Sequence, residues 1–379
     1  MYASARSSLA ALSARSRGEP KSQREAAITE GAMEKVTLEN RPKAVWRRAV
    51  QIIGAIIVVV VLLGLGGLAY QSISEARDRR RYVPPGRMVD VGGYRLHLYC
   101  TGQGSPTVVL ESGLGGPALQ WALVQQKLDQ TTQVCSYDRA GLGWSDVGPG
   151  PRTSQQMARE LHTLLHNAGV EGPYVLVGHS LGGLNVRLFA HEYPDETAGI
   201  VLVASGSEND IARMPPEYGK IEESNKQSDR LFITLTRFGL ARIAGNVGLL
   251  SSYTNLLSKF PADQQKEFVA LTFYRTQYWG TAYAEWSAVT ESRAQAAATG
   301  SLGDLPLVVL SGSPDVSRLP ASFPVEQIKK TFQDLQVELA SLSSVSTHIV
   351  CDTCDHYMPM TNPDIVVDAI NEELAHVHR

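Results

Sequence analysis

The chain contains the sequence Tyr174-Val-Leu-Val-Gly-His-Ser-Leu-Gly-Gly183. Its first four residues are typical of a buried strand, and the residues after Gly183 are compatible with a helix. Between them, Gly178-His-Ser-Leu-Gly182 has the G-x-S-x-G pattern of a tight strand-to-helix turn that exposes a reactive serine. The two glycines leave room for the strained backbone of such a turn. We therefore expect Ser180 to be a nucleophile beside the N–H groups that open the next helix.

Length and composition set broad limits on the rest of the chain. It has 379 residues and a formal net charge of −3, with 19% charged and 43% hydrophobic residues. This length accommodates one large α/β domain with an insertion, or two smaller domains. The hydrophobic fraction fits a globular core with a membrane segment. The nearly neutral charge gives no reason to expect a nucleic-acid partner.

The amino-terminal part of the sequence divides into three segments. Residues 1–48 are rich in Ser, Ala and Arg and are expected to form a disordered tail. Residues 49–70 carry no charge, and as a helix they would span about 33 Å, enough for a single transmembrane helix. A cleaved signal peptide is the alternative. Signal peptides, however, have a charged start shorter than residues 1–48 and an apolar region shorter than residues 49–70. Residues 71–85 resemble a polar stalk linker.

The basic residues around the apolar segment nearly balance. Five precede it and four follow it: Lys35, Arg41, Lys43, Arg47 and Arg48, then Arg77, Arg79, Arg80 and Arg81. The positive-inside rule needs an asymmetry between the two sides, which is small here. We favour a single-pass membrane protein with an inward amino terminus and an extracytoplasmic catalytic domain.

The remaining sequence alternates strand and helix signals. Residues 87–91 and 94–100 flank Gly92-Gly93, a two-residue hairpin turn. Further strands are predicted at 107–112, 133–138, 200–204, 305–311 and 347–351, and helices at 117–130, 153–167 and 363–377. This order predicts a mostly parallel α/β sheet flanked by helices, built from 86–205 and 305–379. Residues 206–304 interrupt the alternation with aromatic-rich helical segments, and we expect them to form a cap over the carboxyl edge of the sheet.

Five motifs carry a resemblance to a known family: Leu110-Glu-Ser-Gly-Leu-Gly-Gly116, Tyr137-Asp-Arg-Ala-Gly-Leu-Gly-Trp-Ser-Asp146, Gly178-His-Ser-Leu-Gly182, Gly312-Ser-Pro-Asp315 and Asp355-His-Tyr357. From about Met88 to His376 the chain resembles an α/β-hydrolase of the alpha/beta hydrolase-1 type. The resemblance implies a mostly parallel eight-stranded sheet with a helical cap insertion. It is weakest in the cap, where substrate choice is usually made.

The order of the motifs predicts a serine, acid and histidine triad. In this fold class the acid and then the histidine follow the serine, in loops at strand ends. His356 follows the last predicted strand and is the expected base, whereas His348 lies within that strand and is expected to be structural. Asp315 follows the strand at 305–311 and is the expected acid. Asp210 is the runner-up for the acid, and Glu208 is less favoured.

The oxyanion that forms during acyl transfer needs two backbone N–H donors. We expect them to come from Leu181, the residue after the nucleophile, and from Leu114 in the glycine-rich loop 112–116. This loop begins Ser112-Gly113, where relatives more often have His-Gly, so a histidine that often braces the loop is missing. No metal or organic cofactor is expected.

The four cysteines leave two alternatives open. Cys351 and Cys354 precede the candidate base, and a zinc site there is disfavoured because a second pair of ligands at suitable spacing is lacking. A Cys351–Cys354 disulfide would stiffen the histidine loop, and Cys100 and Cys135 lie at the ends of strands that are neighbours in this family. Four free, buried thiols are the other interpretation.

Together these features predict a membrane-anchored serine hydrolase that cleaves a small-molecule carboxylic ester. An apolar or lipid-derived acyl group fits the aromatic cap and the membrane segment. Hydrolysis of a lactone, thioester, amide or C–C bond on the same triad is an alternative. A noncatalytic membrane-tethered binding protein is a second alternative, which the intact catalytic positions disfavour. Epoxide hydrolases and dehalogenases fit less well, because those relatives have a carboxylate in place of Ser180.

Overall fold

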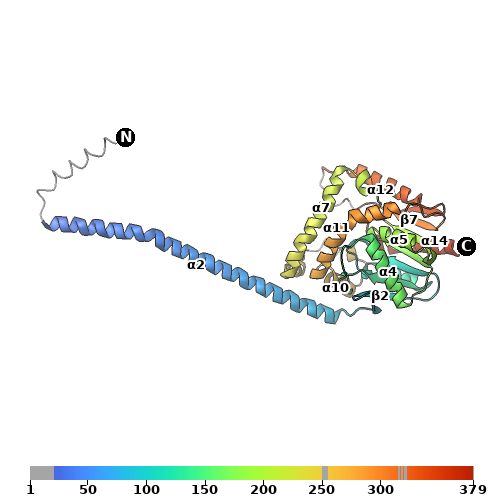
Figure 1. Cartoon of the computed structure of the whole chain (residues 1–379), viewed down its shortest axis with the longest axis horizontal. Coiled ribbons are helices and arrows are strands. Elements are labelled where there is room, and N and C mark those ends of the chain that lie inside the picture. Colours follow the sequence, from blue (N-terminus) through green and yellow to red (C-terminus); the bar gives the residue numbers. More distant parts are fainter. Residues whose placement is uncertain (1–20, 250–254, 315, 317–318, 320–321, 379) are drawn as a thin grey trace. The chain divides into compact units, whose positions relative to one another are not determined.

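The structure is a computed structural model that describes residues 21–249, 255–314, 316, 319 and 322–378 (Figure 1). It divides into two compact units, Met1–Gly66 and Gly67–Arg379. The second unit holds all of the strands and every candidate site residue discussed below.

One eight-stranded sheet forms the centre of the second unit, in the order β1-β2-β4-β3-β5-β6-β7-β8. The first two neighbouring pairs in this order are antiparallel and the remaining five are parallel, so the predicted mostly parallel sheet is confirmed. The strands are β1 (Arg87–Asp90), β2 (Arg95–Thr101), β3 (Thr107–Glu111), β4 (Val134–Asp138), β5 (Tyr174–His179), β6 (Thr197–Val203), β7 (Leu307–Ser311) and β8 (Ser346–Val350).

Helices cover both faces of this sheet. They include α3 (Ala122–Leu128), α4 (Ser154–Ala168), α5 (Leu181–Glu192), α12 (Val325–Ala340) and α14 (Pro363–Val377). Helices α4 and α5 supply much of the core on one face, and α3, α14 and most of α12 supply the core on the other. Helix α12 was not predicted, although its buried residues recur every three or four positions.

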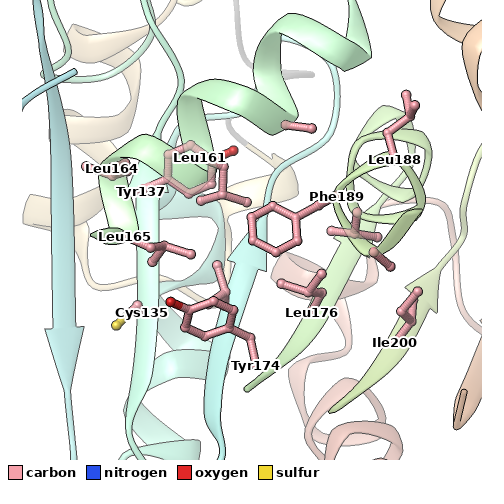
Figure 2. Packing of buried hydrophobic residues seen from close by; sticks show 14 of the residues in the cluster. Cys135, Tyr137, Leu161, Leu164, Leu165, Tyr174, Leu176, Leu188, Phe189 and Ile200 are labelled. Carbon is pink, nitrogen blue, oxygen red and sulfur yellow. The ribbon is translucent and has the colours of Figure 1, made fainter. Parts of the chain in front are cut away.

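Strand β5 shows why the central strands read as continuous apolar runs. Tyr174 and Leu176 point to one face, and Val175 and Val177 to the other, so both sets are buried. Figure 2 shows the first face, where Leu176 lies beneath Phe189 of α5. The strand therefore ends in the interior, and the chain must turn sharply at Ser180 to continue as α5.

The helical insertion lies between β6 and β7. It contains α6 (Asp210–Arg213), α7 (Pro216–Arg237), α8 (Leu240–Asn246), η3 (Asn255–Leu257), α10 (Ala262–Leu271) and α11 (Thr276–Ala298). The long helices α7 and α11 lie side by side (Figure 1). Phe232 of α7 stacks on Trp279 of α11, with ring centroids 4.4 Å apart. We call this insertion the cap.

Helix α2 (Lys21–Arg81) precedes the sheet. The sequence predicted a disordered tail over 1–48. Residues 1–20 lie outside the described residues, and residues 21–48 are helical, consistent with their many Ala, Glu, Lys, Gln and Arg residues. The segment Val45–Arg81 is long and apolar enough to cross a membrane, by length and composition. Residues 71–81, expected to be a stalk, continue this helix.

A buried ion pair joins two neighbouring strands near this helix end. His97 of β2 and Asp138 of β4 stand opposite each other, and the His97 Nδ1 atom lies 2.8 Å from the Asp138 carboxylate. Asp138 also accepts hydrogen bonds from the backbone N–H groups of Ala118 and Trp144. The motif from Tyr137 to Asp146 therefore holds the strand to the loops on either side of it. This is a structural role.

The His97–Asp138 pair predicts a pH dependence of stability. Burial alone favours the neutral imidazole, but the hydrogen bond and charge of Asp138 outweigh it and raise the pKa of His97. Burial alone also favours the protonated carboxyl, but the contacts with His97 and the two N–H groups lower the pKa of Asp138. A raised histidine pKa stabilises the fold at pH values below about 6.5, the unfolded value, and this stabilisation is lost as the pH rises through the folded pKa. The Asp138 contribution is lost at acidic pH.

We therefore expect the Tm of the His97→Gln variant to fall less than that of the wild type as the pH rises from 6 to 9. Calorimetry of both proteins at matched pH values measures the difference, which removes the contributions of other titrating groups. Parallel Tm curves for the two proteins would contradict this assignment.

The structure forms two disulfides, Cys100–Cys135 and Cys351–Cys354. The first joins opposite positions of β2 and β4, and the second closes a short loop directly before the candidate base. The alternative of four free thiols is therefore not what the structure contains.

Candidate active site

Ser180 occupies a strained turn between β5 and α5. Its backbone has φ 53° and ψ −118°, a conformation that a residue with a side chain rarely adopts. Hydrogen bonds hold the turn in place: the Ser180 N–H donates to Val203 O (3.1 Å), and Ser180 O accepts from the N–H groups of Gly183 and Gly206 (3.0 Å each). A strained residue held this firmly is a common feature of reactive sites.

The glycines around Ser180 are required by close backbone packing. A Cβ atom at Gly178 would lie 2.6 Å from Gly182 O, and one at Gly182 would lie 2.6 Å from Glu111 O. A Cβ atom at Gly183 would clash with the hydroxyl of Ser205. Small residues are therefore needed here because the start of α5 touches β3 and the loop after β6.

His356 reaches the nucleophile from the other end of the chain. It lies in the loop between β8 and α13 (Met358–Thr361), and its Nε2 atom is 3.1 Å from Ser180 Oγ. The preceding Asp355 shapes this loop by accepting hydrogen bonds from the Tyr357 N–H and the Thr361 hydroxyl, both at 2.8 Å. The structure therefore brings together the predicted nucleophile and the predicted base.

His179 positions the backbone of His356. Its Nε2 atom lies 2.8 Å from the carbonyl oxygen of His356, so this nitrogen carries the proton and donates. Its Nδ1 atom faces the amide of Gln120 at 3.4 Å. Burial and the nearby His356 lower the pKa of His179 to about 3, so the ring stays neutral. No sequence pattern predicted this contact, because His179 and His356 are 177 residues apart.

The predicted acid, Asp315, lies outside the described residues. The described part of its loop is nevertheless attached to the histidine loop, because the Ser313 N–H donates to Cys354 O at 2.8 Å. A Cβ atom at Gly312 would lie 2.7 Å from the same carbonyl oxygen. The described residues directly before Asp315 therefore lie against the loop that carries the base.

The two alternative acids are engaged with arginines. Asp210 lies 3.7 Å from the Arg293 guanidinium, and burial raises its pKa to about 7. Glu208 makes two hydrogen bonds to Arg187, at 2.6 and 3.0 Å. Both carboxylates therefore have structural partners that connect the loop after β6 to helices α5 and α11.

The glycine-rich loop after β3 lies against the nucleophile. A Cβ atom at Gly113 would be 3.2 Å from Ser180 Cβ. In this loop the Gly115 N–H donates to Glu285, and the Gly116 N–H donates to Gly113 O. The Leu114 N–H has no hydrogen-bond acceptor among the described residues. The Leu181 N–H lies in the first turn of α5, where backbone N–H groups have no carbonyl partner within the helix. The assignment of these two N–H groups as oxyanion donors stays a prediction.

Arg139 and Glu285 brace this loop in place of the missing histidine. The Arg139 guanidinium donates to Ser112 O and Gly113 O at 2.6 and 2.7 Å. It also pairs with Glu111 (2.6 Å) and with Glu285 of cap helix α11 (2.8 Å), and all three side chains are buried. Burial raises the pKa of Glu111, although Arg139 opposes the shift. No local sequence pattern predicts this cluster, because Arg139 and Glu285 are 146 residues apart.

Apolar residues of the cap lie beside both candidate oxyanion donors. Trp286 and Val289 of α11 pack in one cluster with Leu114 and Leu181. Tyr278, one turn before Ala282 on the same helix, approaches the loop from the cap, since a Cβ atom at Gly115 would lie 3.3 Å from its hydroxyl oxygen. The surroundings of Ser180 on the cap side are therefore largely apolar and aromatic.

The described residues contain no group of three His, Cys, Asp or Glu side chains arranged to hold a metal ion. A hydroxyl, an imidazole within hydrogen-bond distance of it, and two nearby backbone N–H groups are the components of nucleophilic acyl transfer.

Comparison with known proteins supports the family indicated by the motifs. A family profile described as "alpha/beta hydrolase fold" matches residues 106–368. Over 136 residues the chain is 36% identical to the "Probable transporter efuK" of Hormonema carpetanum, a stretch that is 34% of this chain and 20% of that protein. The chain thus spans about a fifth of the length of that curated relative.

Solved structures share the fold. An esterase from Thermogutta terrifontis is 24% identical with a TM-score of 0.56, and the match covers 77% of this chain and 99% of that one. The Cif epoxide hydrolase from Acinetobacter nosocomialis is 14% identical with a TM-score of 0.62, and the match covers 81% and 96%. At these identities the likeness concerns the fold alone. The family profile covers more than half of the chain, and the chain therefore belongs to the alpha/beta hydrolase fold family.

Proposed function

We propose that this protein is a membrane-anchored serine hydrolase that cleaves carboxylic esters with an apolar acyl group. The observation that carries the proposal is the 3.1 Å separation of His356 Nε2 and Ser180 Oγ at a strained turn, next to the Leu114 and Leu181 N–H groups. We assign 86–205 and 305–379 to the catalytic core, 206–304 to the cap and 49–70 to the membrane anchor.

The proposed reaction has two stages. Ser180 Oγ attacks the ester carbonyl carbon while His356 takes its proton, and the N–H groups of Leu114 and Leu181 bind the resulting oxyanion. His356 then gives the proton to the leaving alcohol, which leaves an acyl-enzyme. In the second stage His356 takes a proton from water, which attacks the acyl-enzyme and releases the acid. In this scheme Asp315 orients His356 and stabilises its charged form.

The substrate class is supported by the surroundings of the site. Trp286 and Val289 pack in one apolar cluster with Leu114 and Leu181, and the Arg139 guanidinium is engaged by Glu111 and Glu285 rather than facing a substrate. An acyl chain against this apolar cluster leaves water, and each buried CH₂ contributes about 0.8 kcal/mol. An apolar acyl group suits this environment better than a charged one.

The membrane assignment and the extracytoplasmic orientation are supported by two features. Residues 49–70 form an uncharged helical stretch, and both disulfides are of the kind that persist in oxidising compartments. Because the positive-inside count is nearly even, the disulfides are the stronger argument for orientation.

The function is tested with the full chain in detergent and a series of p-nitrophenyl esters from acetate to octanoate. We expect kcat/KM to rise along the series, by roughly tenfold or more between the shortest and the longest acyl chain. A Ser180→Ala protein prepared identically corrects for spontaneous and contaminant hydrolysis.

Two results would contradict the proposal in different ways. Fastest cleavage of the acetate would overturn the apolar acyl preference while leaving ester hydrolysis intact. Absence of ester cleavage by a protein whose Ser180 still reacts with a fluorophosphonate would favour the lactone, thioester or amide alternatives instead.

A further inference from the structure

The carboxyl end of the apolar segment packs directly on the cap. A Cβ atom at Gly67 would lie 2.6 Å from Phe238 O, and one at Gly239 would lie 2.6 Å from the Tyr70 ring. Gly239 has φ 74° and begins the turn from α7 into α8. Because a glycine lies at each contact point, the helix backbone can approach the cap backbone at Gly67, and the Tyr70 ring can approach the cap backbone at Gly239.

Polar contacts continue this attachment beyond Tyr70. The buried Gln71 side chain donates to Tyr274 O at 2.7 Å. Glu75 accepts from the N–H and the hydroxyl of Thr276, both at 3.0 Å. One turn later, Asp78 pairs with Arg242 of α8. Residues 67–78 and the cap are therefore held together by specific contacts rather than joined through a loose stalk.

Helix α8 has its apolar side chains on the outside. Its Arg242 is buried against Asp78 and Tyr274, with the guanidinium 4.7 Å from the Tyr274 ring centre. The apolar residues of α8 and of the turn after it are exposed instead: Leu240 by 48%, Ile243 by 49%, Val247 by 68% and Leu249 by 74%. We call these four residues the apolar corner. A helix on an aqueous surface shows the opposite pattern.

The depth of the apolar corner in the membrane follows from the contact of the adjoining Gly239 with Tyr70. Tyr70 is the last residue of the segment 49–70 that the proposed function places in the membrane, and tyrosines are enriched where a span leaves the hydrocarbon. Gly239, in contact with Tyr70, lies at the same depth, and Leu240 follows it directly. Exposed arginines lie near this region in the sequence, including Arg77 after the span and Arg237 before the corner. Such cations suit lipid headgroups.

Aromatic side chains connect this region of the cap to the catalytic loop. Phe232, on α7 before the corner, stacks on Trp279. Trp279 makes an edge contact with Tyr278, at 5.0 Å between ring centres. The Tyr278 hydroxyl approaches Gly115 in the loop that holds the candidate oxyanion donor Leu114. A row of packed aromatic rings, with Trp279 buried at its centre, thus leads from α7 to the catalytic loop.

We propose that the apolar corner is embedded in the lipid bilayer surface and that the enzyme draws its substrate, an acyl ester dissolved in the membrane, from that surface. This inference rests on the membrane anchor and ester hydrolysis of the proposed function and adds the source of the substrate. An embedded corner holds the cap at the lipid headgroups, so a long acyl chain reaches the site without crossing water.

The position of the corner is tested independently of catalysis. The full chain carrying Ile243→Cys is labelled with the fluorophore NBD and reconstituted into phosphatidylcholine vesicles, and the matched control carries Val345→Cys, an exposed apolar position between α12 and β8. We expect a several-fold increase in emission and quenching by nitroxide lipids for the label at 243, and neither effect at 345. Water-like emission at both positions, in protein that floats with the vesicles, would overturn the corner alone. Protein that does not float with the vesicles would overturn the anchor and the corner together.

The source of the substrate is tested with the triple variant Leu240→Ser, Ile243→Ser and Val247→Ser. We expect kcat/KM for a long-chain ester in vesicles to fall by roughly tenfold or more, while cleavage of a soluble short-chain ester stays within about twofold. The control is Val345→Ser, which should change neither rate. Equal rates of the triple variant and the wild type on the vesicle substrate would overturn the proposal, whereas failure of the wild type on both esters would overturn the proposed function.

Discussion

Replacement of Ser180 by alanine is expected to lower kcat for ester hydrolysis by about 10⁴-fold or more and to abolish labelling by a fluorophosphonate. The hydroxyl is the only group removed, and the strained turn is held by backbone hydrogen bonds that alanine retains. His356→Ala should cause a loss of similar size, because serine and base act as one unit. Gel fluorescence of the labelled full chain and steady-state kinetics measure the two effects.

A histidine and a serine elsewhere in the chain provide control variants for His356 and Ser180. His348 lies on β8, eight positions before His356, and its Nε2 atom bonds Ser311 Oγ at 2.8 Å. Ser341 is an exposed serine at the end of α12. His348→Ala and Ser341→Ala should both retain labelling. Full labelling of the Ser180→Ala protein would mean that another residue is the nucleophile, and the proposed function would then be wrong.

Replacement of Arg139 by methionine is expected to damage both stability and catalysis. Methionine keeps most of the volume but leaves Glu111 and Glu285 buried without their cation, which costs about 3–5 kcal/mol of unfolding free energy. It also removes the donors to Ser112 O and Gly113 O, which hold the loop of the proposed oxyanion donor Leu114. Loss of one oxyanion donor typically lowers kcat by about 10²–10³-fold.

Arg95 provides the matched control for this experiment. It also pairs with a carboxylate, Asp146, but both side chains are substantially exposed. Arg95→Met should therefore change the unfolding free energy by about 1 kcal/mol or less and leave kcat unaltered. Chemical denaturation and kinetics of the two variants, side by side, make the comparison. If Arg139→Met matched Arg95→Met in both measurements, the cluster would not support the loop.

Local patterns predicted those parts of the fold that depend on neighbouring residues. The apolar run before Gly178 predicted a strand buried on both faces, and β5 is such a strand. Gly178 and Gly182 predicted a tight turn, and each would clash if it carried a Cβ atom, as would Gly183. Helix α12 was not predicted, although its buried residues recur at helical spacing.

The amino-acid sequence alone determined the family, the sheet and the residues of the nucleophile turn, because glycine positions and apolar periodicity act over a few residues. Only the tertiary structure decided what supports the candidate site. The partnership of Arg139 with Glu285 and the contact of Gly239 with Tyr70 both join segments more than a hundred residues apart. Such contacts follow from how the cap packs on the core and on helix α2. A buried charge has no local period that reveals its partner, so only the packed fold pairs it.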